Sequence, residues 1–145
     1  RRQRQMCIRD SLYAQLEVAD KINDRRLAIW DKYYEGLKEL KDEGKIELQV
    51  IPEGCKHNAH MFFMKAKDLQ ERTELIKYLK ENEIQTVFHY IPLHTAPAGI
   101  KYGRFHGEDR YTTKESERLM RLPMHYALTD EDVECVIEKI KEFYK

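Results

Sequence analysis

Apolar residues recur at helical spacing from Ser11 to Gly44, where the glycine predicts the end of a helix. A helix of roughly 30 residues would be about 45 Å long, which is more than a small domain needs. Because such a helix commonly docks against another domain or subunit, we expect Trp30, Tyr33 and Tyr34 to form an exposed apolar patch on it. The recurring positions are Leu12, Leu16, Ala19, Ile22, Trp30, Tyr33, Leu37 and Leu40.

After Gly44 the apolar period changes to two, which is the spacing of a half-buried strand. Alternation over residues 46–50 predicts the first strand. The apolar run at 59–66 predicts the second strand, and residues 85–90 predict the third. Between the second and third strands we expect a helix that begins after Asp68, because its carboxylate can accept a hydrogen bond from the first turn.

The remaining chain predicts two further helices separated by an extended segment. Residues 114–121 are typical of a short helix, and residues 122–124 follow as extended chain. Thr129 and Asp132 have the spacing of a capping box, which opens a final helix with one apolar stripe. This order favours an α+β fold in which a small, mostly antiparallel sheet carries helices on one face, preceded by the long bridging helix.

Residues 1–10 differ from the rest, because they hold four arginines and one acid with little to bury. We exclude them from the fold as a non-native or disordered basic segment; a basic arm that binds RNA is the alternative. Residues 11–145 are predicted to form one domain. Its bridging helix covers 11–43 and its α+β sandwich covers 44–145.

Composition limits the kinds of partner that the chain could bind and the cell compartment in which it would work. The chain has 145 residues and a net charge of 0, so no global field would concentrate nucleic acid or an anionic membrane around it. No apolar run approaches the roughly 18 residues needed to cross a bilayer. Three widely spaced cysteines argue against a disulfide framework and favour a reducing cytoplasm. We therefore expect a cytoplasmic domain that binds neither nucleic acid nor membrane.

Six histidines raise the hypothesis of a metalloenzyme. His57 and His60 are three residues apart, and His89 and His94 are five apart. A zinc site needs three or four convergent ligands, and no paired cysteines or metalloprotease helix motif accompany these histidines. The spacing alone therefore gives a metal site little support, and we predict none.

The segment HYIPLH, residues 89–94, is a stronger candidate for a binding site. It begins at the end of a predicted strand and enters a long polar loop, where rigid scaffolds commonly place binding groups. His89, Tyr90 and His94 offer donors and acceptors suited to a phosphate or a sugar hydroxyl. The alternative is that these side chains only satisfy backbone groups of the loop.

The same loop carries Arg104 and His106 close to two glycines, so it could fold over an anionic ligand. Glu108 and Asp109 lie beside Arg110, however, and their local pairing argues against a simple phosphate clamp. The residues contain no glycine-rich phosphate loop and no complete catalytic set. From the residues alone, the chain is a binding domain.

Four strings resemble the C-terminal domain of the DegT-type sugar-nucleotide aminotransferases, which are pyridoxal-phosphate enzymes of the aspartate-aminotransferase fold. Coverage runs from Ser11 to Lys145, and the order and spacing of the strings make the combination specific. The strings are LYAQLEVADKINDRRLAIWDKYYEGL, IPEGCKHNAHMFF, VFHYIPLH and HGEDRYTTKESERLMRLPMHYALTDEDVECVI.

The resemblance implies that this chain is the C-terminal portion of a longer enzyme. The Schiff-base lysine and most contacts to pyridoxal 5'-phosphate would lie upstream of Ser11, so no catalytic residue is nominated here, and the chain alone would neither bind the cofactor nor be active. The longer protein would be a homodimer that uses a nucleotide sugar and an amino-acid donor. It would transfer an amino group, with L-glutamate as the donor, to C4 of a dTDP-4-keto-6-deoxyhexose.

By the same resemblance, His89, Tyr90 and His94 would face the cofactor and the sugar. The loop from Thr95 to Thr112 would help wall the cleft near the nucleotide sugar, with Arg104 and His106 binding the substrate. His57, Asn58 and His60 would shape the edge of the sheet. The alternative function is a free-standing α+β module that holds a small anionic ligand through its HYxPxH loop.

Overall fold

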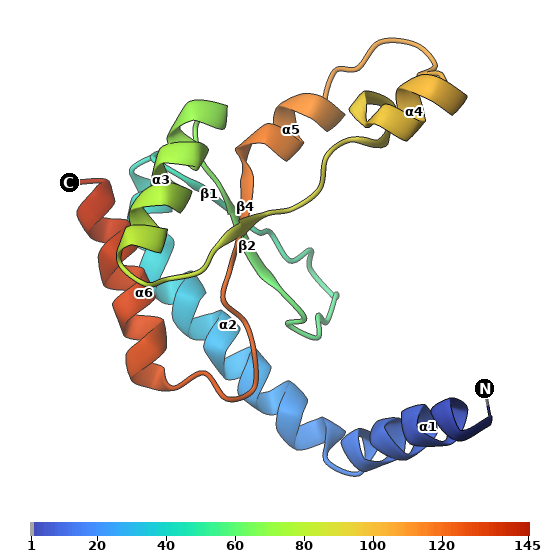
Figure 1. The fold of residues 1–145 in the computed structure, drawn as a ribbon. Helices are drawn as coiled ribbons and strands as arrows, with labels where there is room; N and C mark the ends of the chain where they lie inside the picture. The colour runs from blue at the N-terminus through green and yellow to red at the C-terminus, as the bar shows by residue number, and fades with distance from the viewer. Residues whose placement is uncertain (1) are drawn as a thin grey trace.

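The computed structural model describes residues 2–145, with side chains described from Met6 onward (Figure 1). Short strands alternate with helices along the chain. In chain order the elements are α1 (Arg2–Leu16), α2 (Ala19–Asp42), β1 (Glu47–Leu48), β2 (Phe62–Lys65), α3 (Leu69–Glu81), β3 (Val87–Phe88), a 3-10 turn (Leu93–Thr95), α4 (Pro97–Tyr102), α5 (Thr112–Arg118), β4 (Leu119–Leu122) and α6 (Asp130–Phe143).

The four strands form one antiparallel sheet in the order β1-β2-β4-β3. Phe62 pairs with Leu122 and Met64 with Met120, so these four side chains point to the same face. All four are buried. Helices α2, α3 and α6 pack on that face (Figure 1), and their buried side chains complete the core. The predicted α+β fold, with helices on one face of an antiparallel sheet, is therefore confirmed.

Side-chain caps fix where two of the packed helices begin. The Asp68 carboxylate accepts a hydrogen bond from the backbone N–H of Glu71 at 2.9 Å, which starts α3. The Thr129 hydroxyl accepts from the N–H of Asp132 at 3.1 Å, and the Asp132 carboxylate accepts from the N–H of Thr129 at 2.9 Å. This reciprocal pair is the capping box that the sequence predicts for α6.

The single long helix expected over residues 11–43 is instead two helices. α1 ends at Leu16, and α2 begins after Val18, whose backbone lies outside the helical region. No glycine or proline marks the break. The chain is helical from Arg2, so the described part of the segment 1–10 continues α1. The domain division at residue 10 stays a prediction.

The prediction that Trp30 and Tyr33 form an exposed apolar patch is wrong. Trp30 is 5% exposed and Tyr33 is fully buried. Other residues of the chain cover both side chains. The centroid of the Trp30 ring lies 5.1 Å from that of Tyr34, on which it stacks, and 4.4 Å from that of His57. The Tyr33 hydroxyl donates a hydrogen bond to the Pro123 carbonyl at 3.1 Å. These residues therefore belong to the closed core.

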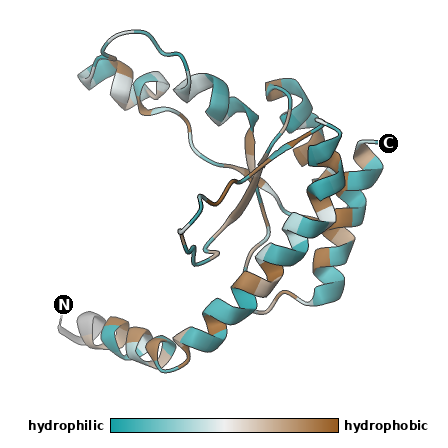
Figure 2. Cartoon of the chain, turned by 180° about the vertical axis from the view of Figure 1, so that it is seen from behind, coloured by the Kyte–Doolittle hydropathy of each residue, from teal (hydrophilic) through white to brown (hydrophobic). Residues whose placement is uncertain are grey.

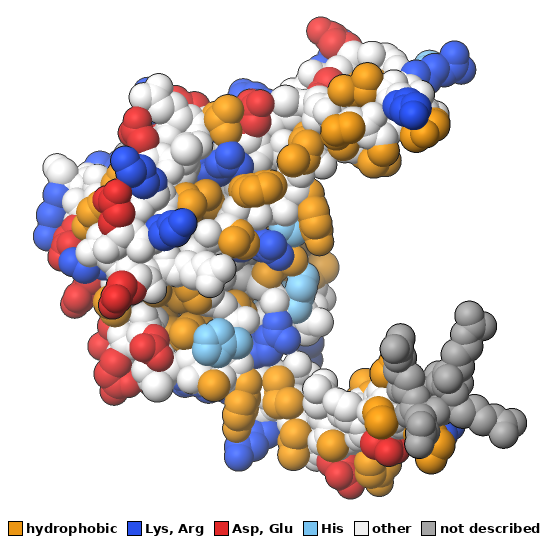
Figure 3. All heavy atoms as spheres, viewed as in Figure 1, with side chains coloured by type: hydrophobic (Ala, Val, Ile, Leu, Met, Phe, Trp, Pro, Cys, Tyr) orange, Lys and Arg blue, Asp and Glu red, His pale blue; other side chains and the backbone are white. Residues whose placement is uncertain are grey.

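Exposed apolar side chains gather instead on two projections, α1 and the loop segment from Tyr90 to Tyr111. Both project from the sandwich on the same side of the molecule (Figures 1 and 3), and Figure 2 shows hydrophobic residues along each of them. Across the described residues, no helix is long and apolar enough to span a bilayer. The exposed set is Met6, Ile8, Leu12, Tyr13, Leu16, Tyr90, Ile91, Leu93, Ile100, Tyr102, Phe105 and Tyr111.

Candidate functional site

His89 and Tyr90 leave the sheet directly after β3. The His89 side chain is half-buried, and its ring contacts the Tyr90 ring at 4.4 Å. Its Nδ1 atom is buried and has no hydrogen-bond partner among the described residues. Burial lowers the pKa of His89, and the nearby charges of Arg121 and His60 lower it further. The imidazole is therefore held neutral, with one ring nitrogen unused.

His94 has a different environment, because it closes the loop. Its Nε2 lies 2.8 Å from the Asp109 carboxylate, and its ring contacts Phe105 at 4.4 Å. The same carboxylate accepts hydrogen bonds from the Thr113 hydroxyl at 2.5 Å and from the Thr112 N–H at 2.9 Å. The Thr113 hydrogen bond is the main reason that the pKa of Asp109 is lowered. His94 therefore ties the start of the loop to the beginning of α5.

Arg104 and His106 are exposed, and neither forms a hydrogen bond or an ion pair with another described residue. Arg110 pairs with Glu108 at 3.0 Å, as the local charge pattern predicts. Within the described chain no hydrogen bond, ion pair or ring contact joins the His89–Tyr90 pair to His94. The structure therefore does not gather the predicted residues into one contact cluster.

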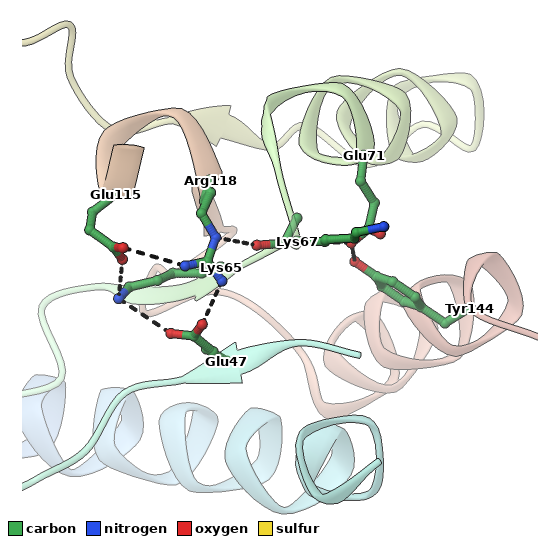
Figure 4. A network of polar contacts seen from close by, with 8 residues as sticks. Glu47, Lys65, Lys67, Glu71, Glu115, Arg118 and Tyr144 are labelled. Atoms are coloured by element: carbon green, nitrogen blue, oxygen red, sulfur yellow. Dashed lines mark hydrogen bonds and ion pairs between the residues drawn. The ribbon is translucent and has the colours of Figure 1, made fainter. Parts of the chain in front are cut away.

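A network of four charged side chains fixes the base of the loop segment (Figure 4). Lys65 lies 2.6 Å from the Glu115 carboxylate and 3.5 Å from that of Glu47. Arg118 reaches Glu47 at 2.5 Å, and its Nε donates to the Ala66 carbonyl at 2.9 Å. The Lys65 ammonium lowers the pKa of Glu115. Because these residues come from β1, β2 and α5, the network holds α5 against the sheet.

The face of the sheet opposite the helices holds a residue that sequence reasoning missed. Arg121 pairs with Phe63 on one side and Val87 on the other, so it points away from the helices. Its Nε is buried and lacks a partner among the residues that the structure describes. The sequence LMRL at 119–122 carries no local signal for this residue, because only the pairing with the two neighbouring strands assigns Arg121 to its face.

The described residues assemble no metal site, and four of their lysines do not suit covalent attachment of a cofactor. In the described part of the chain, no group of three or more His, Cys, Asp or Glu side chains could hold a metal ion. A lysine that attacks a carbonyl carbon needs a lowered pKa. Four lysines have a clearly shifted pKa, and in each the shift is upward: Lys32, Lys41, Lys65 and Lys139. These four lysines thus do not fit covalent attachment of pyridoxal phosphate.

The α+β fold of this chain is also found as one part of solved aminotransferase structures. Its structure is similar to that of the aminotransferase TlmJ from Streptoalloteichus hindustanus, with a TM-score of 0.79 and 25% identity over 91% of this chain and 34% of that one. Residues 11–141 match the DegT/DnrJ/EryC1/StrS aminotransferase family. The chain belongs to this family.

Two relatives illustrate how much of a family member the chain represents. The pleiotropic regulatory protein of Geobacillus stearothermophilus is 33% identical over 73% of this chain and 29% of its own length. The dTDP-3-amino-3,4,6-trideoxy-alpha-D-glucose transaminase of Micromonospora megalomicea subsp. nigra is 29% identical over 81% of this chain and 31% of its own length. The chain therefore spans about a third of the length of these relatives.

Proposed function

We propose that the chain is the C-terminal domain of a pyridoxal-phosphate-dependent sugar-nucleotide aminotransferase. The observation that carries this proposal is the family match over residues 11–141, combined with coverage of only about a third of each relative. The domain has a closed core of its own and two projections with exposed apolar side chains. The part of the relatives' length that this chain does not cover would correspond to the cofactor-binding domain.

For the whole protein, the proposed reaction is transfer of an amino group to C4 of a dTDP-4-keto-6-deoxyhexose. The product would be dTDP-4-amino-4,6-dideoxygalactose, a building block of enterobacterial common antigen, which is a cell-surface polysaccharide. L-glutamate is the proposed donor. Support comes from the four strings quoted above and from the relative whose name is that of a dTDP-amino-sugar transaminase. The enzyme is proposed to work in the cytoplasm as a homodimer.

The residues of this chain would bind and position rather than react. Pyridoxal phosphate, when bound by the longer protein, supplies the electron sink for the exchange of the amino group. His89 and Tyr90 are proposed to face the cleft from the end of β3. His94 would hold the loop closed through Asp109, while Arg104 and His106, which are free of intramolecular partners among the described residues, would contact the substrate.

The first test compares this chain with a longer protein that includes the preceding sequence. Each is mixed with pyridoxal phosphate, and the visible spectrum is recorded before and after borohydride reduction. We expect a reducible cofactor band only in the longer protein, which should also convert a dTDP-4-keto-6-deoxyhexose and L-glutamate to the amino sugar. A stoichiometric reducible band in the 145-residue chain would place the attachment lysine here and overturn the assignment.

The same comparison separates the alternative function. If neither protein shows a band, the free-standing module that binds an anionic ligand through residues 89–94 is favoured. If the longer protein has the band but acts on another keto sugar or another donor, only the substrate assignment fails.

A further inference from the structure

The sheet ends in two edge strands, β1 and β3, whose side chains differ. An edge strand presents unpaired backbone N–H and C=O groups, and proteins commonly protect it with charged residues or proline. On β1, the Glu47 carboxylate is ion-paired with Lys65 and Arg118. Residues 84–88, which lead into and form β3, read IQTVF and contain neither a charge nor a proline. The β3 edge is therefore open to pairing with another strand.

A groove of about 580 Å³ follows this edge, between β3 and α3. Every residue from 84 to 88 lines it. Because successive side chains of an extended segment point to opposite faces, a groove lined by all of them lies along the edge of the strand and not on one face. Val87 is 40% exposed and Phe88 is 45% exposed, so apolar surface is uncovered where an added strand would lie.

α3 forms the other wall of the groove through one stripe of side chains at four-residue spacing, Arg72, Ile76 and Lys80. At one end, the Glu83 N–H donates to the Lys80 carbonyl at 3.1 Å. At the other end, the Arg72 guanidinium lies 5.5 Å from the centroid of the Phe88 ring. The helix and the strand therefore run antiparallel. Four helical residues rise about 6 Å and two strand residues about 6.6 Å, so alternate side chains of an added strand would stay in step with this stripe.

Two buried polar atoms beside the groove have no partner in the described chain. Thr86, which lines the groove, is 6% exposed, and its hydroxyl forms no hydrogen bond; nor does the Nε atom of Arg72. Buried polar groups in native structures are almost always paired, so these two need an explanation. Among the described residues, neither Arg72 nor Lys80 forms an ion pair. The groove thus offers an unused hydroxyl and two unpaired cations on either side of Ile76.

We propose that the β3 edge and the α3 stripe bind an extended peptide segment of another protein by strand addition. The backbone of the peptide would continue the sheet beyond β3. Its side chains at every second residue would face the stripe, with an acidic residue toward Arg72, an apolar one toward Ile76 and an acidic one toward Lys80. The charges of the stripe therefore select an acidic–apolar–acidic alternation. This site goes beyond the proposed function and depends on neither cofactor nor catalysis.

The test uses the 145-residue chain, whose core is closed by its own side chains, and an acetylated and amidated peptide of sequence TETVTET. The backbone amide resonances of the chain are followed by NMR during addition of the peptide. We expect saturable shifts at residues 84–88 and none at Glu47 and Leu48 on the other edge. The same peptide with N-methyl groups on its three central residues lacks their backbone donors and should cause no shift. Absence of a saturable shift at about 5 mM of the parent peptide would overturn the proposal.

Reversing the charge at one end of the stripe should reverse the preference for peptide charge. Lys80→Glu should weaken binding of TETVTET by about two- to fivefold and strengthen binding of TKTVTKT by a similar factor. Lys77→Glu is the matched control, because Lys77 lies on α3 outside the groove lining and pairs with Glu81 at 3.9 Å. K77E should leave both affinities unchanged. An unchanged ratio of the two affinities in K80E, or an equal change in K77E, would contradict the proposed site.

Two further measurements identify other occupants of the edge. If sedimentation shows that the chain forms a dimer that TETVTET dissociates, the edge binds a second copy and the proposal is wrong. If a longer protein that includes the preceding sequence does not bind the peptide, the rest of that protein covers the edge, and the proposal is again wrong. Peptide binding is measured without cofactor or substrate, so its outcome is separate from the test of transaminase activity.

Discussion

The packed sandwich and the two projections are held by different forces. In the sandwich, large side chains such as Tyr33, Phe62 and Leu37 are fully buried between sheet and helices. In the projections most apolar side chains are exposed, and the loop segment is closed by local bonds such as the one between His94 and Asp109. Because folding stability comes mainly from apolar burial, it resides in the sandwich. The projections leave apolar surface exposed.

The largest difference should come from truncating an aromatic residue in each region. Phe62 is fully buried at the centre of the core, so Phe62→Ala should lower the free energy of unfolding by about 3–5 kcal/mol. Tyr102 on α4 is 78% exposed, and Tyr102→Ala should change the free energy of unfolding by less than about 0.5 kcal/mol. Urea unfolding followed by circular dichroism measures both. Similar losses for the two variants would contradict a division of the molecule into these regions.

A smaller effect is expected at the junction between the regions, where the charged network holds α5. The Arg118 side chain is 15% exposed and binds Glu47, Glu115 and the Ala66 carbonyl. Arg118→Gln should cost about 1–2 kcal/mol, because it leaves a partly buried carbonyl and two carboxylates with fewer donors. Arg110→Gln removes an exposed pair and should cost about 0–0.5 kcal/mol. The same urea unfolding assay measures both variants. If R118Q unfolds with the same free energy as wild type, α5 is not anchored by this network.

The next largest loss of stability should come from removing a helix cap in the sandwich. Thr129→Ala removes one half of the capping box and should destabilise the chain by about 1 kcal/mol. Thr73→Ala is the matched control, because the Thr73 hydroxyl only donates to the Leu69 carbonyl within α3. That control should be neutral or slightly stabilising. If thermal unfolding shows the same shift for both variants, the cap contributes nothing specific.

Local sequence patterns predict the elements of the sandwich that carry their own signals. α6 follows from its capping box and its apolar stripe, and α3 from Asp68. β4 was expected to be the end of a helix up to Arg121, because LMRL gives no local sign of a strand. Its pairing with β2, more than 50 residues earlier in the chain, determines it. Non-local pairing of this kind is not visible in a short sequence window.

The candidate site was harder to predict than the fold for the same reason. The motif HYIPLH correctly indicates where the chain leaves the sheet. It does not indicate that His94 is bound by Asp109, since that contact crosses a loop without periodicity. The length of the predicted helix placed Trp30 on the surface, but His57, from a loop distant in sequence, covers it. Contacts between loops and distant residues therefore set the limit of the sequence prediction.

The smallest expected effect, and the most local, concerns the His94–Asp109 contact in the loop. The pKa of Asp109 is lowered below its ordinary value of 3.8, chiefly by the Thr113 hydrogen bond. A carboxylate whose pKa is lower in the folded state favours that state above its ordinary pKa, and the contribution is lost as the pH falls through the lowered value. The loop should therefore stay closed at neutral pH and open only as the pH falls below 3.8, through the lowered pKa of Asp109.

This opening can be followed through the backbone amide of Thr113, which donates to the Asp109 carboxylate. Its NMR shift should change as the pH is lowered from 6 to 2, and Asp109→Asn should abolish that change. Asp130→Asn is the matched control: Asp130 also has a lowered pKa, but its partner Arg25 lies in the sandwich. D130N should keep the Thr113 transition. A transition that persists in D109N would show that the loop is closed by contacts other than this carboxylate.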